Sequence, residues 1–152
     1  MTFGKKDKSA TVGETPSSGE LDEISYPENV RVLMAEDNEM NQQLVKHLLI
    51  AHHFSFEMVS TGDDALKKLR EKQFDIVLMD IQMPGKDGYE TTRLVRNELN
   101  NNIPIVAMTA YAFPGDKEKC LSAGFDDYIT KPIREQELIN VIFRNIGEKK
   151  NK

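Results

Sequence analysis

One short apolar run constrains the fold of this chain more than any other feature. Residues 76–79, Ile-Val-Leu-Met, form an unbroken run that ends at a carboxylate, Asp80. A run without alternation is typical of a strand covered on both faces, as in a parallel sheet. Residues 84–88, Pro-Gly-Lys-Asp-Gly, then predict a tight loop. Because functional groups in open α/β sheets lie at the carboxyl ends of strands, Asp80 is a candidate site residue.

Comparable segments recur along the chain and alternate with helical patterns. Strands are predicted at residues 30–35, 54–59, 76–79, 105–108 and 127–130. Helices are predicted at about residues 39–51, 61–72, 88–99, 114–124 and 134–146. This order predicts an α/β fold, a doubly wound five-stranded parallel sheet with helices on both faces. The second strand alternates most, so we expect it near an edge.

Local signals predict where individual helices begin and end. Asn38 is expected to cap the first helix. Pro114 suits the first turn of the fourth helix, where its missing N–H costs nothing, and Gly124 suits the C-terminal end of that helix. The buried stripe of the first helix is expected at Leu44, Val45, Leu48 and Leu49.

Length and composition favour a single domain with short extensions. The chain has 152 residues, 39% of them hydrophobic and 30% charged, which suits one globular core. Residues 1–28 are polar and contain few bulky apolar side chains, so we expect a flexible linker or tail there. The folded domain is expected at residues 29–147, with a charged tail at residues 148–152.

Charge and cysteine content narrow the partners and the compartment. The net charge of −5 argues against nucleic-acid binding, which usually needs a basic face. No secretory segment follows Met1 and no apolar run approaches the roughly 18 residues of a spanning helix, so we expect no membrane contact by this chain. The single cysteine, Cys120, cannot form an internal disulfide, and the cytoplasm is the expected location.

Four of the predicted strands end in a distinct polar group. Glu36 and Asp37 follow the first strand, and Asp80 ends the third. Thr109 follows the fourth strand and Lys131 the fifth. The carboxyl ends of parallel strands share one edge, so we expect these side chains in one crevice. Clustered carboxylates need a counter-charge, and oxygen ligands with room for water suit Mg²⁺.

The same groups suit phosphoryl transfer. Lys131 supplies a positive charge and Thr109 a hydroxyl, and with a cation they can bracket the oxygens of a phosphoryl group. Asp80 is the best nucleophile candidate, because it ends the middle strand and precedes a tight loop; its product would be an aspartyl phosphate. Glu36 and Asp37 are better candidates for metal ligands.

With these residues together, the chain resembles a response-regulator receiver domain over about residues 29–146. The motifs are Glu36-Asp37, Asp80 within Leu-Met-Asp-Ile-Gln-Met-Pro, Asp87-Gly88, Thr109-Ala110 and Lys131-Pro132. The resemblance implies a flavodoxin-like sheet of order 2-1-3-4-5 and a cis peptide before Pro132. It also implies a Mg²⁺ site made by Asp37, Asp80, the backbone carbonyl of Gln82 and, through water, Glu36.

The resemblance implies a conformational switch as well. Phosphorylation in the family draws the threonine, here Thr109, toward the phosphate and lets an aromatic residue, here Tyr128, turn inward. This change reaches the face made by the fourth helix, the fifth strand and the fifth helix. Residues flanking the site, here Gln82 and Tyr111, set the phosphoryl lifetime, and we expect the bulky Tyr111 to lengthen it.

Residues 36–41, Glu-Asp-Asn-Glu-Met-Asn, form a Glu-Asp-Asn-x-x-Asn pattern that is similar to the one in receivers attached to hybrid sensor histidine kinases. We therefore expect the C-terminal receiver of a hybrid kinase, with a free-standing single-domain response regulator as the main alternative. The expected partner is a histidine kinase or a histidine phosphotransfer protein, which donates from a phosphohistidine. The domain itself is expected to be a phosphoacceptor that promotes its own phosphorylation and dephosphorylation, rather than an enzyme.

Other classes share only part of this pattern. Mg²⁺-dependent hydrolases with an aspartyl-phosphate intermediate usually carry a second Asp two positions after the nucleophile, where this chain has Gln82. A flavin mononucleotide-binding electron carrier needs a Ser, Thr or Gly phosphate loop after the first strand, where Glu36 and Asp37 would repel the phosphate. A degenerate receiver that only binds partners would not need the complete set of site residues.

Overall fold

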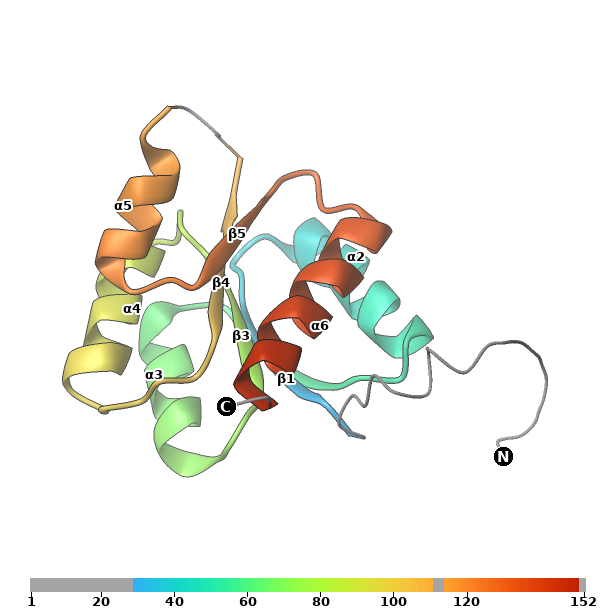
Figure 1. Ribbon diagram of the computed structural model, residues 1–152, viewed down its shortest axis with the longest axis horizontal. Helices are drawn as coiled ribbons and strands as arrows, with labels where there is room; N and C mark the ends of the chain where they lie inside the picture. Colours follow the sequence, from blue (N-terminus) through green and yellow to red (C-terminus); the bar gives the residue numbers. More distant parts are fainter. Residues whose placement is uncertain (1–28, 111–113, 151–152) are drawn as a thin grey trace.

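The computed structural model describes residues 29–110 and 114–150, with side chains described as far as residue 146. In this part of the chain, one parallel sheet contains β1 (Arg31–Ala35), β2 (Ser55–Val59), β3 (Ile76–Asp80), β4 (Ile105–Thr109) and β5 (Asp127–Thr130). The alternating helices are α2 (Glu39–Ala51), α3 (Gly62–Glu71), α4 (Gly88–Asn97), α5 (Asp116–Ala123) and α6 (Glu135–Lys150) (Figure 1). The strand order β2-β1-β3-β4-β5 confirms the predicted fold and the edge position of β2.

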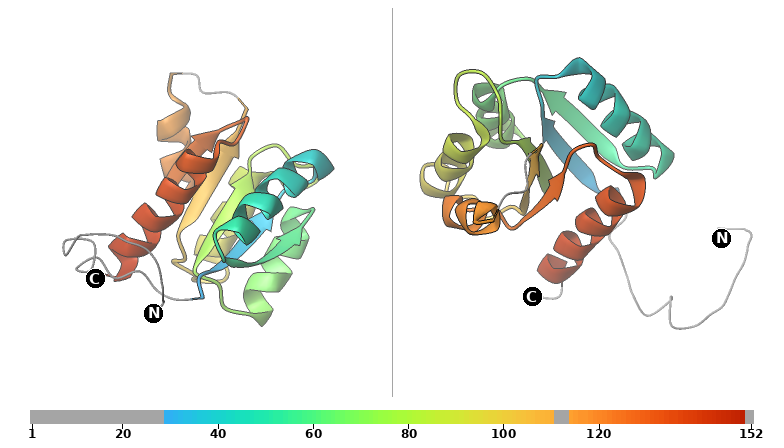
Figure 2. Two further views of the ribbon diagram at one scale, coloured as in Figure 1. Left: turned by 90° about the vertical axis from the view of Figure 1, so that its right-hand side faces the viewer. Right: turned by 90° about the horizontal axis from the view of Figure 1, so that it is seen from above.

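The sheet is covered on both faces, by α2 and α6 on one and by α3, α4 and α5 on the other (Figure 2). Successive strand residues point to opposite faces. Thus β1 places Val32 and Met34 in the core beneath α2 and α6, and Leu33 and Ala35 in the core beneath the other three helices. All five residues of β3 and of β4 are buried. This double coverage explains why their sequences do not alternate.

The register of the sheet aligns the ends of its strands. Ala35 pairs with Met79, Asp80 pairs with Met108, and Thr109 pairs with Thr130. The strands run parallel, so their carboxyl ends meet at one edge, with β3 in the middle. Asp80 therefore lies between the segment that follows β1 and the end of β4.

Three helices start at this edge with a side-chain cap. Asn38 accepts a hydrogen bond from the Asn41 amide at 2.9 Å, as the sequence predicted. Thr61 and Asp87 cap α3 and α4 in the same way. Each cap satisfies one of the amides that a helix start leaves without a partner in the helix. At the C-terminal end of α5, Gly124 has the expected left-handed conformation, with φ of 108°.

Three sequence-based expectations for the helices were wrong in detail. Leu44 is 38% exposed, because the buried stripe of α2 is narrower and contains Val45, Leu48 and Leu49. Pro114 precedes α5 rather than starting it. Gly115 has a left-handed φ of 92°, which is incompatible with the helix, so the helix begins only at Asp116. The last helix continues to Lys150, since Glu148, Lys149 and Lys150 are of residue types that favour helices. Among the described helices, none is long and apolar enough to cross a membrane.

Arg96 links chain segments at the amino-terminal ends of β4 and β5, at the edge of the sheet opposite the carboxyl edge. Its guanidinium donates to the carbonyl of Gly124 through two nitrogens, at 3.0 and 2.8 Å, and to Oδ2 of Asp126 at 2.9 Å. It also donates to the carbonyls of Asn101 and Ile103, at 2.9 and 2.6 Å. One side chain on α4 thus fixes the segment before β4 and the segment between α5 and β5.

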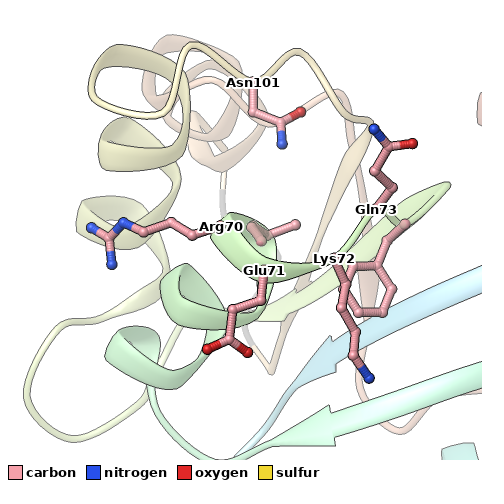
Figure 3. Close-up of a pocket in the computed structure, with 7 residues that line it drawn as sticks. Arg70, Glu71, Lys72, Gln73 and Asn101 are labelled. Carbon is pink, nitrogen blue, oxygen red and sulfur yellow. The ribbon is translucent and has the colours of Figure 1, made fainter.

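A polar pocket of about 420 Å³ lies at this same edge (Figure 3). Figure 3 shows the side chains of Arg70 and Lys72 extending in different directions, so they do not converge on one anion site. The pocket lies before the start of β3, at the opposite end of that strand from Asp80, and is separate from the candidate site. Its lining comprises Leu69, Arg70, Glu71, Lys72, Gln73, Phe74 and Asn101.

Candidate functional site

Three carboxylates meet at the carboxyl edge of the sheet. Glu36 and Asp37 follow β1, and Asp80 is the last residue of β3. One carboxylate oxygen from each lies within 4.8 Å of the other two. Glu36 is fully buried and Asp80 is only 2% exposed, whereas Asp37 faces solvent. The cluster therefore has an inner charged part and one open side.

Lys131 brings a positive charge into this cluster from the end of β5. Its Nζ lies 3.0 Å from Oε1 of Glu36 and 3.2 Å from Oδ1 of Asp80. Its backbone amide donates to the carbonyl of Thr109 at 2.7 Å, which anchors the residue beside β4. The peptide bond between Lys131 and Pro132 is cis, as expected. The ammonium thus contacts the first acidic residue and the central carboxylate together.

Burial and charge shift the ionisation of this pair. Burial raises the pKa of the Asp80 carboxyl from 3.8 to about 6; the negative charge of Glu36 adds to the rise, while Lys131 opposes it. Burial alone would lower the pKa of the Lys131 ammonium, but its contacts with Glu36 and Asp80 outweigh that effect and raise its pKa. The lysine therefore stays charged, and the central carboxylate has less counter-charge than full ionisation requires.

Glu36 is held at both its side chain and its backbone. The amide of Asn38 donates to Oε2 at 3.0 Å, and Oε1 faces Lys131. The amide of Glu36 donates to the carbonyl of Val59 at 3.0 Å, and its own carbonyl accepts from Nε2 of Gln42. The side chain is therefore fixed before any ligand arrives.

The loop after β3 packs closely against Asp80. The amide of Gln82 donates to Oδ1 of Asp80 at 3.1 Å, and the amide of Gly88 donates to the carbonyl of Ile81 at 2.9 Å. A Cβ atom at Gly88 would lie 2.5 Å from the carbonyl oxygen of Asp80. Only glycine therefore allows α4 to start this close to the strand end, which explains the Asp-Gly pair in the sequence.

The two predicted switch residues lie beside the cluster and on the adjoining face. Thr109 is 8% exposed and follows Met108, the residue that pairs with Asp80. Tyr128 is half-buried and packs against the core beneath α3, α4 and α5. Tyr111, which we expect to lengthen the phosphoryl lifetime, lies outside the described residues.

The donor set fits a hard divalent cation such as Mg²⁺. All three clustered side chains offer oxygen ligands, and the exposed position of Asp37 leaves room for the waters that Mg²⁺ retains. A single ammonium, from Lys131, cannot neutralise three carboxylates. In the described part of the chain, Oε1 of Glu36 is also a buried oxygen with no hydrogen bond of regular geometry, although Lys131 is nearby.

Sequence reasoning missed two contacts of this site. Asn38 was expected only as a helix cap, yet its backbone amide also binds Glu36. Gln42 was not singled out at all, although its side chain contacts the backbone of the same residue. Both contacts involve backbone atoms, which no motif of side chains encodes. Every predicted site residue in the described ranges lies at the carboxyl edge or on the adjoining β5.

Comparisons with known proteins agree with this geometry. A family model described as the response regulator receiver domain matches residues 32–143. The chain is 46% identical over 136 residues to hybrid signal transduction histidine kinase I of Dictyostelium discoideum, a match covering 83% of this chain and 8% of that protein. It is 40% identical over 125 residues to the autoinducer 2 sensor kinase/phosphatase LuxQ of Vibrio vulnificus, a match covering 82% of this chain and 14% of that protein. The chain thus spans only a small part of these relatives.

Solved structures share the fold over nearly their whole length. One is the receiver domain of a sensor histidine kinase from Pseudomonas aeruginosa with magnesium coordinated in its active site cleft; it is 37% identical, with a TM-score of 0.72, over 78% of this chain and 98% of that one. Another comes from the co-crystal of a Saccharomyces cerevisiae histidine phosphotransfer protein with the receiver domain of its downstream response regulator. It is 29% identical, with a TM-score of 0.76, over 82% of this chain and 93% of that one. Sheet order, clustered carboxylates and family match agree, and the chain belongs to the response regulator receiver domain family.

Proposed function

We propose that this receiver domain accepts a phosphoryl group from a phosphohistidine onto Asp80. The observation that carries the proposal is the setting of that carboxylate. It is almost fully buried at the end of the central strand, and an ammonium lies 3.2 Å from one of its oxygens. Two further carboxylates lie close enough to share a cation with it. Such a site holds charged groups in advance around an entering phosphoryl group.

The transfer is a displacement at phosphorus. A carboxylate oxygen of Asp80 forms the new bond to phosphorus, the bond from phosphorus to the imidazole nitrogen breaks, and its electron pair stays on that nitrogen. Lys131 is close enough to contact a phosphoryl oxygen while it keeps its link to Glu36. Thr109, at the neighbouring strand end, is the proposed hydroxyl donor.

The proposed Mg²⁺ ligands are Asp37, Asp80 and the backbone carbonyl of Gln82, with Glu36 acting through water. Their oxygens match the ligands this cation prefers. When bound, Mg²⁺ neutralises negative charge on the transferring phosphoryl group. The protein side of the site supplies the orientation: Glu36 is fixed by Asn38, and the amide of Gln82 already binds Asp80.

The proposed consequence of phosphorylation is a change at the face made by α5, β5 and α6. Thr109 would move toward the phosphoryl group, and Tyr128 would turn further inward. Two observations support this coupling. Thr109 and Thr130 pair directly across β4 and β5, and Tyr128 already packs against the core that α5 covers.

We further propose that the chain is the C-terminal receiver of a hybrid histidine kinase located in the cytoplasm, with a kinase or histidine phosphotransfer protein as partner. Support comes from the curated relatives, which include hybrid and sensor kinases many times longer than this chain. In this proposal residues 1–28 form a linker, residues 29–147 the receiver, and residues 148–152 a charged tail, of which residues 148–150 continue α6. The domain in this proposal is a phosphoacceptor that promotes its own phosphorylation and dephosphorylation, rather than an enzyme. An open reading frame encoding a kinase core upstream of Met1 supports this origin, and a stop codon there would favour a free-standing regulator.

The direct test is labelling with a small phosphodonor. The protein is incubated with acetyl phosphate and Mg²⁺, and we expect an acid-stable, base-labile phosphoryl group. Asp80→Asn should abolish the label, while Asp63→Asn, a change at a largely exposed carboxylate on α3, should keep it. Equal labelling of Asp80→Asn and the parent would refute the proposal. Rapid turnover of many unrelated phosphoesters would instead indicate a hydrolase.

A further inference from the structure

Gln42 lies outside the acidic cluster but contacts its backbone. The residue is in the first half of α2 and is partly buried, whereas its neighbour Gln43 is exposed. Its Nε2 donates to the carbonyl of Glu36 and also lies 3.3 Å from Oγ of Ser60. A carbonyl oxygen can only accept, so the nitrogen end of the amide must face Glu36. The amide carries two hydrogens and can serve both contacts.

These two contacts join the loops that follow two neighbouring strands. Glu36 follows β1, and Ser60 follows β2. The amide of Glu36 already donates to the carbonyl of Val59, so the two loops meet at a backbone bond and at the Gln42 side chain. Gln42 therefore fixes the peptide plane that leads from Glu36 to Asp37.

A continuous series of contacts leads from Gln42 to the phosphoryl acceptor. Gln42 binds the backbone of Glu36, and the carboxylate of Glu36 lies 3.0 Å from the Lys131 ammonium. That ammonium lies 3.2 Å from Asp80. A shift of the Glu36 backbone would move its carboxylate, which is fully buried and held by Asn38 and Lys131. The same shift would turn the peptide that carries Asp37.

We propose that Gln42 is a positioning residue of the acceptor site. It holds the Glu36–Asp37 peptide in the orientation that binds the cation, and through Glu36 it holds Lys131 against Asp80. The inference rests on the proposed function, because the geometry it maintains is that of the phosphoryl site. Residues that orient metal ligands typically contribute about tenfold or more to metal affinity.

The test replaces the amide without changing the length of the side chain. Gln42→Met removes the donor, and Gln43→Met makes the same chemical change at an exposed neighbouring position. Mg²⁺ is titrated into each purified protein, and binding is followed by the backbone amide NMR signals of Asp37 and Gln82. We expect Gln42→Met to weaken Mg²⁺ binding about tenfold and to shift the carbonyl ¹³C signal of Glu36 before Mg²⁺ is added. Gln43→Met should match the parent in both measurements.

Two results would overturn the inference. One is an unchanged Mg²⁺ affinity and Glu36 carbonyl signal in Gln42→Met; the other is an equal loss of affinity in Gln43→Met. A lower thermal stability that accompanies the first of these results would show that Gln42 has a purely structural role. If Gln42→Met does not fold, Gln42→Asn, whose amide is one methylene too short, gives the same comparison. A parent that binds Mg²⁺ but never labels at Asp80 would refute the proposed function and leave the Mg²⁺ comparison for Gln42 intact.

Discussion

The ammonium nitrogen of Lys131 lies 3.2 Å from Oδ1 of Asp80; Asp80 is buried, and the Lys131 side chain is 17% exposed. The two residues come from strand ends separated by β4 in the sheet, and only the fold brings them together. Glu36 accompanies the pair, with Oε1 at 3.0 Å from the same nitrogen. The contact therefore belongs to a charged network in which each member restricts the others.

Removing the ammonium is expected to slow phosphorylation strongly. Lys131→Met should reduce the labelling rate with acetyl phosphate at saturating Mg²⁺ by about 10²–10³-fold, the cost typical of losing one preorganised charge-stabilising group. Lys72→Met, which removes a surface ammonium paired with Glu57, is the control and should retain the parent rate. A Lys131→Met rate within twofold of the parent would show that the contact does not serve the reaction.

The raised pKa of Asp80 predicts a pH-dependent difference in stability. Its carboxyl has a pKa of about 6 in the folded protein against 3.8 as the reference value, so its ionisation destabilises the fold as the pH rises between these values. In metal-free protein, the stability of Asp80→Asn relative to the parent should increase as the pH rises from about 4 to about 7, by up to roughly 3 kcal/mol at about 1.4 kcal/mol per pKa unit. Urea unfolding of both proteins in chelator at pH 5 and pH 8 measures this difference. An equal difference at both pH values would contradict the prediction.

Adding a methyl group at Gly88 is expected to displace the acceptor loop. The new Cβ would lie 2.5 Å from the carbonyl oxygen of Asp80 and 2.8 Å from Cα of Ile81, and backbone atoms have little freedom to yield. Gly88→Ala should therefore lower the free energy of unfolding by about 1–3 kcal/mol and slow phosphorylation. Gly85→Ala is the comparison, because nothing lies within 4 Å of its Cβ position and only its φ of 75° is unfavourable. Equal phosphorylation rates in Gly88→Ala and Gly85→Ala would contradict the proposed role of the close approach.

The Arg96 network predicts a large loss of stability far from the acceptor site. Arg96→Met leaves the carbonyls of Gly124 and Ile103 without this donor and should lower the free energy of unfolding by about 2–4 kcal/mol. Arg93→Met, at an exposed position on the same helix, should change it by less than about 0.5 kcal/mol. Urea unfolding measures both. A similar small effect for the two variants would mean that the network does not stabilise the fold.

Most of the fold follows from the sequence, because its strands are short apolar runs and its helices carry recognisable caps. The apolar run before Asp80 predicted a doubly covered strand, and all its residues are buried. The start of α5 was less predictable. Pro114 favours a helix start by its own chemistry, yet the left-handed Gly115 delays the helix until Asp116. Local propensity does not determine whether the helix begins at Pro114 or only after Gly115.

The sequence also predicted which residues form the site, but it did not predict their contacts. Placing Asp80 and Lys131 at strand ends predicted that they would lie at one edge, whereas their 3.2 Å contact depends on strand register and on side-chain burial. Leu44 shows the same limit on a helix, since apolar spacing does not reveal where a buried stripe ends. Gln42 required the loop conformation, because its partner is a backbone carbonyl.

The measurement that tests the central claim most directly is chemical mapping of the phosphorylated residue. The protein is phosphorylated with acetyl phosphate and Mg²⁺, treated with borohydride, and digested for mass spectrometry. Borohydride reduces an aspartyl phosphate to homoserine and leaves free carboxylates unchanged. We predict homoserine at position 80 alone, and none at positions 36 or 37. Homoserine at either of those positions, or a phosphoryl group retained on His47, His52 or His53, would contradict the assignment of Asp80 as the acceptor.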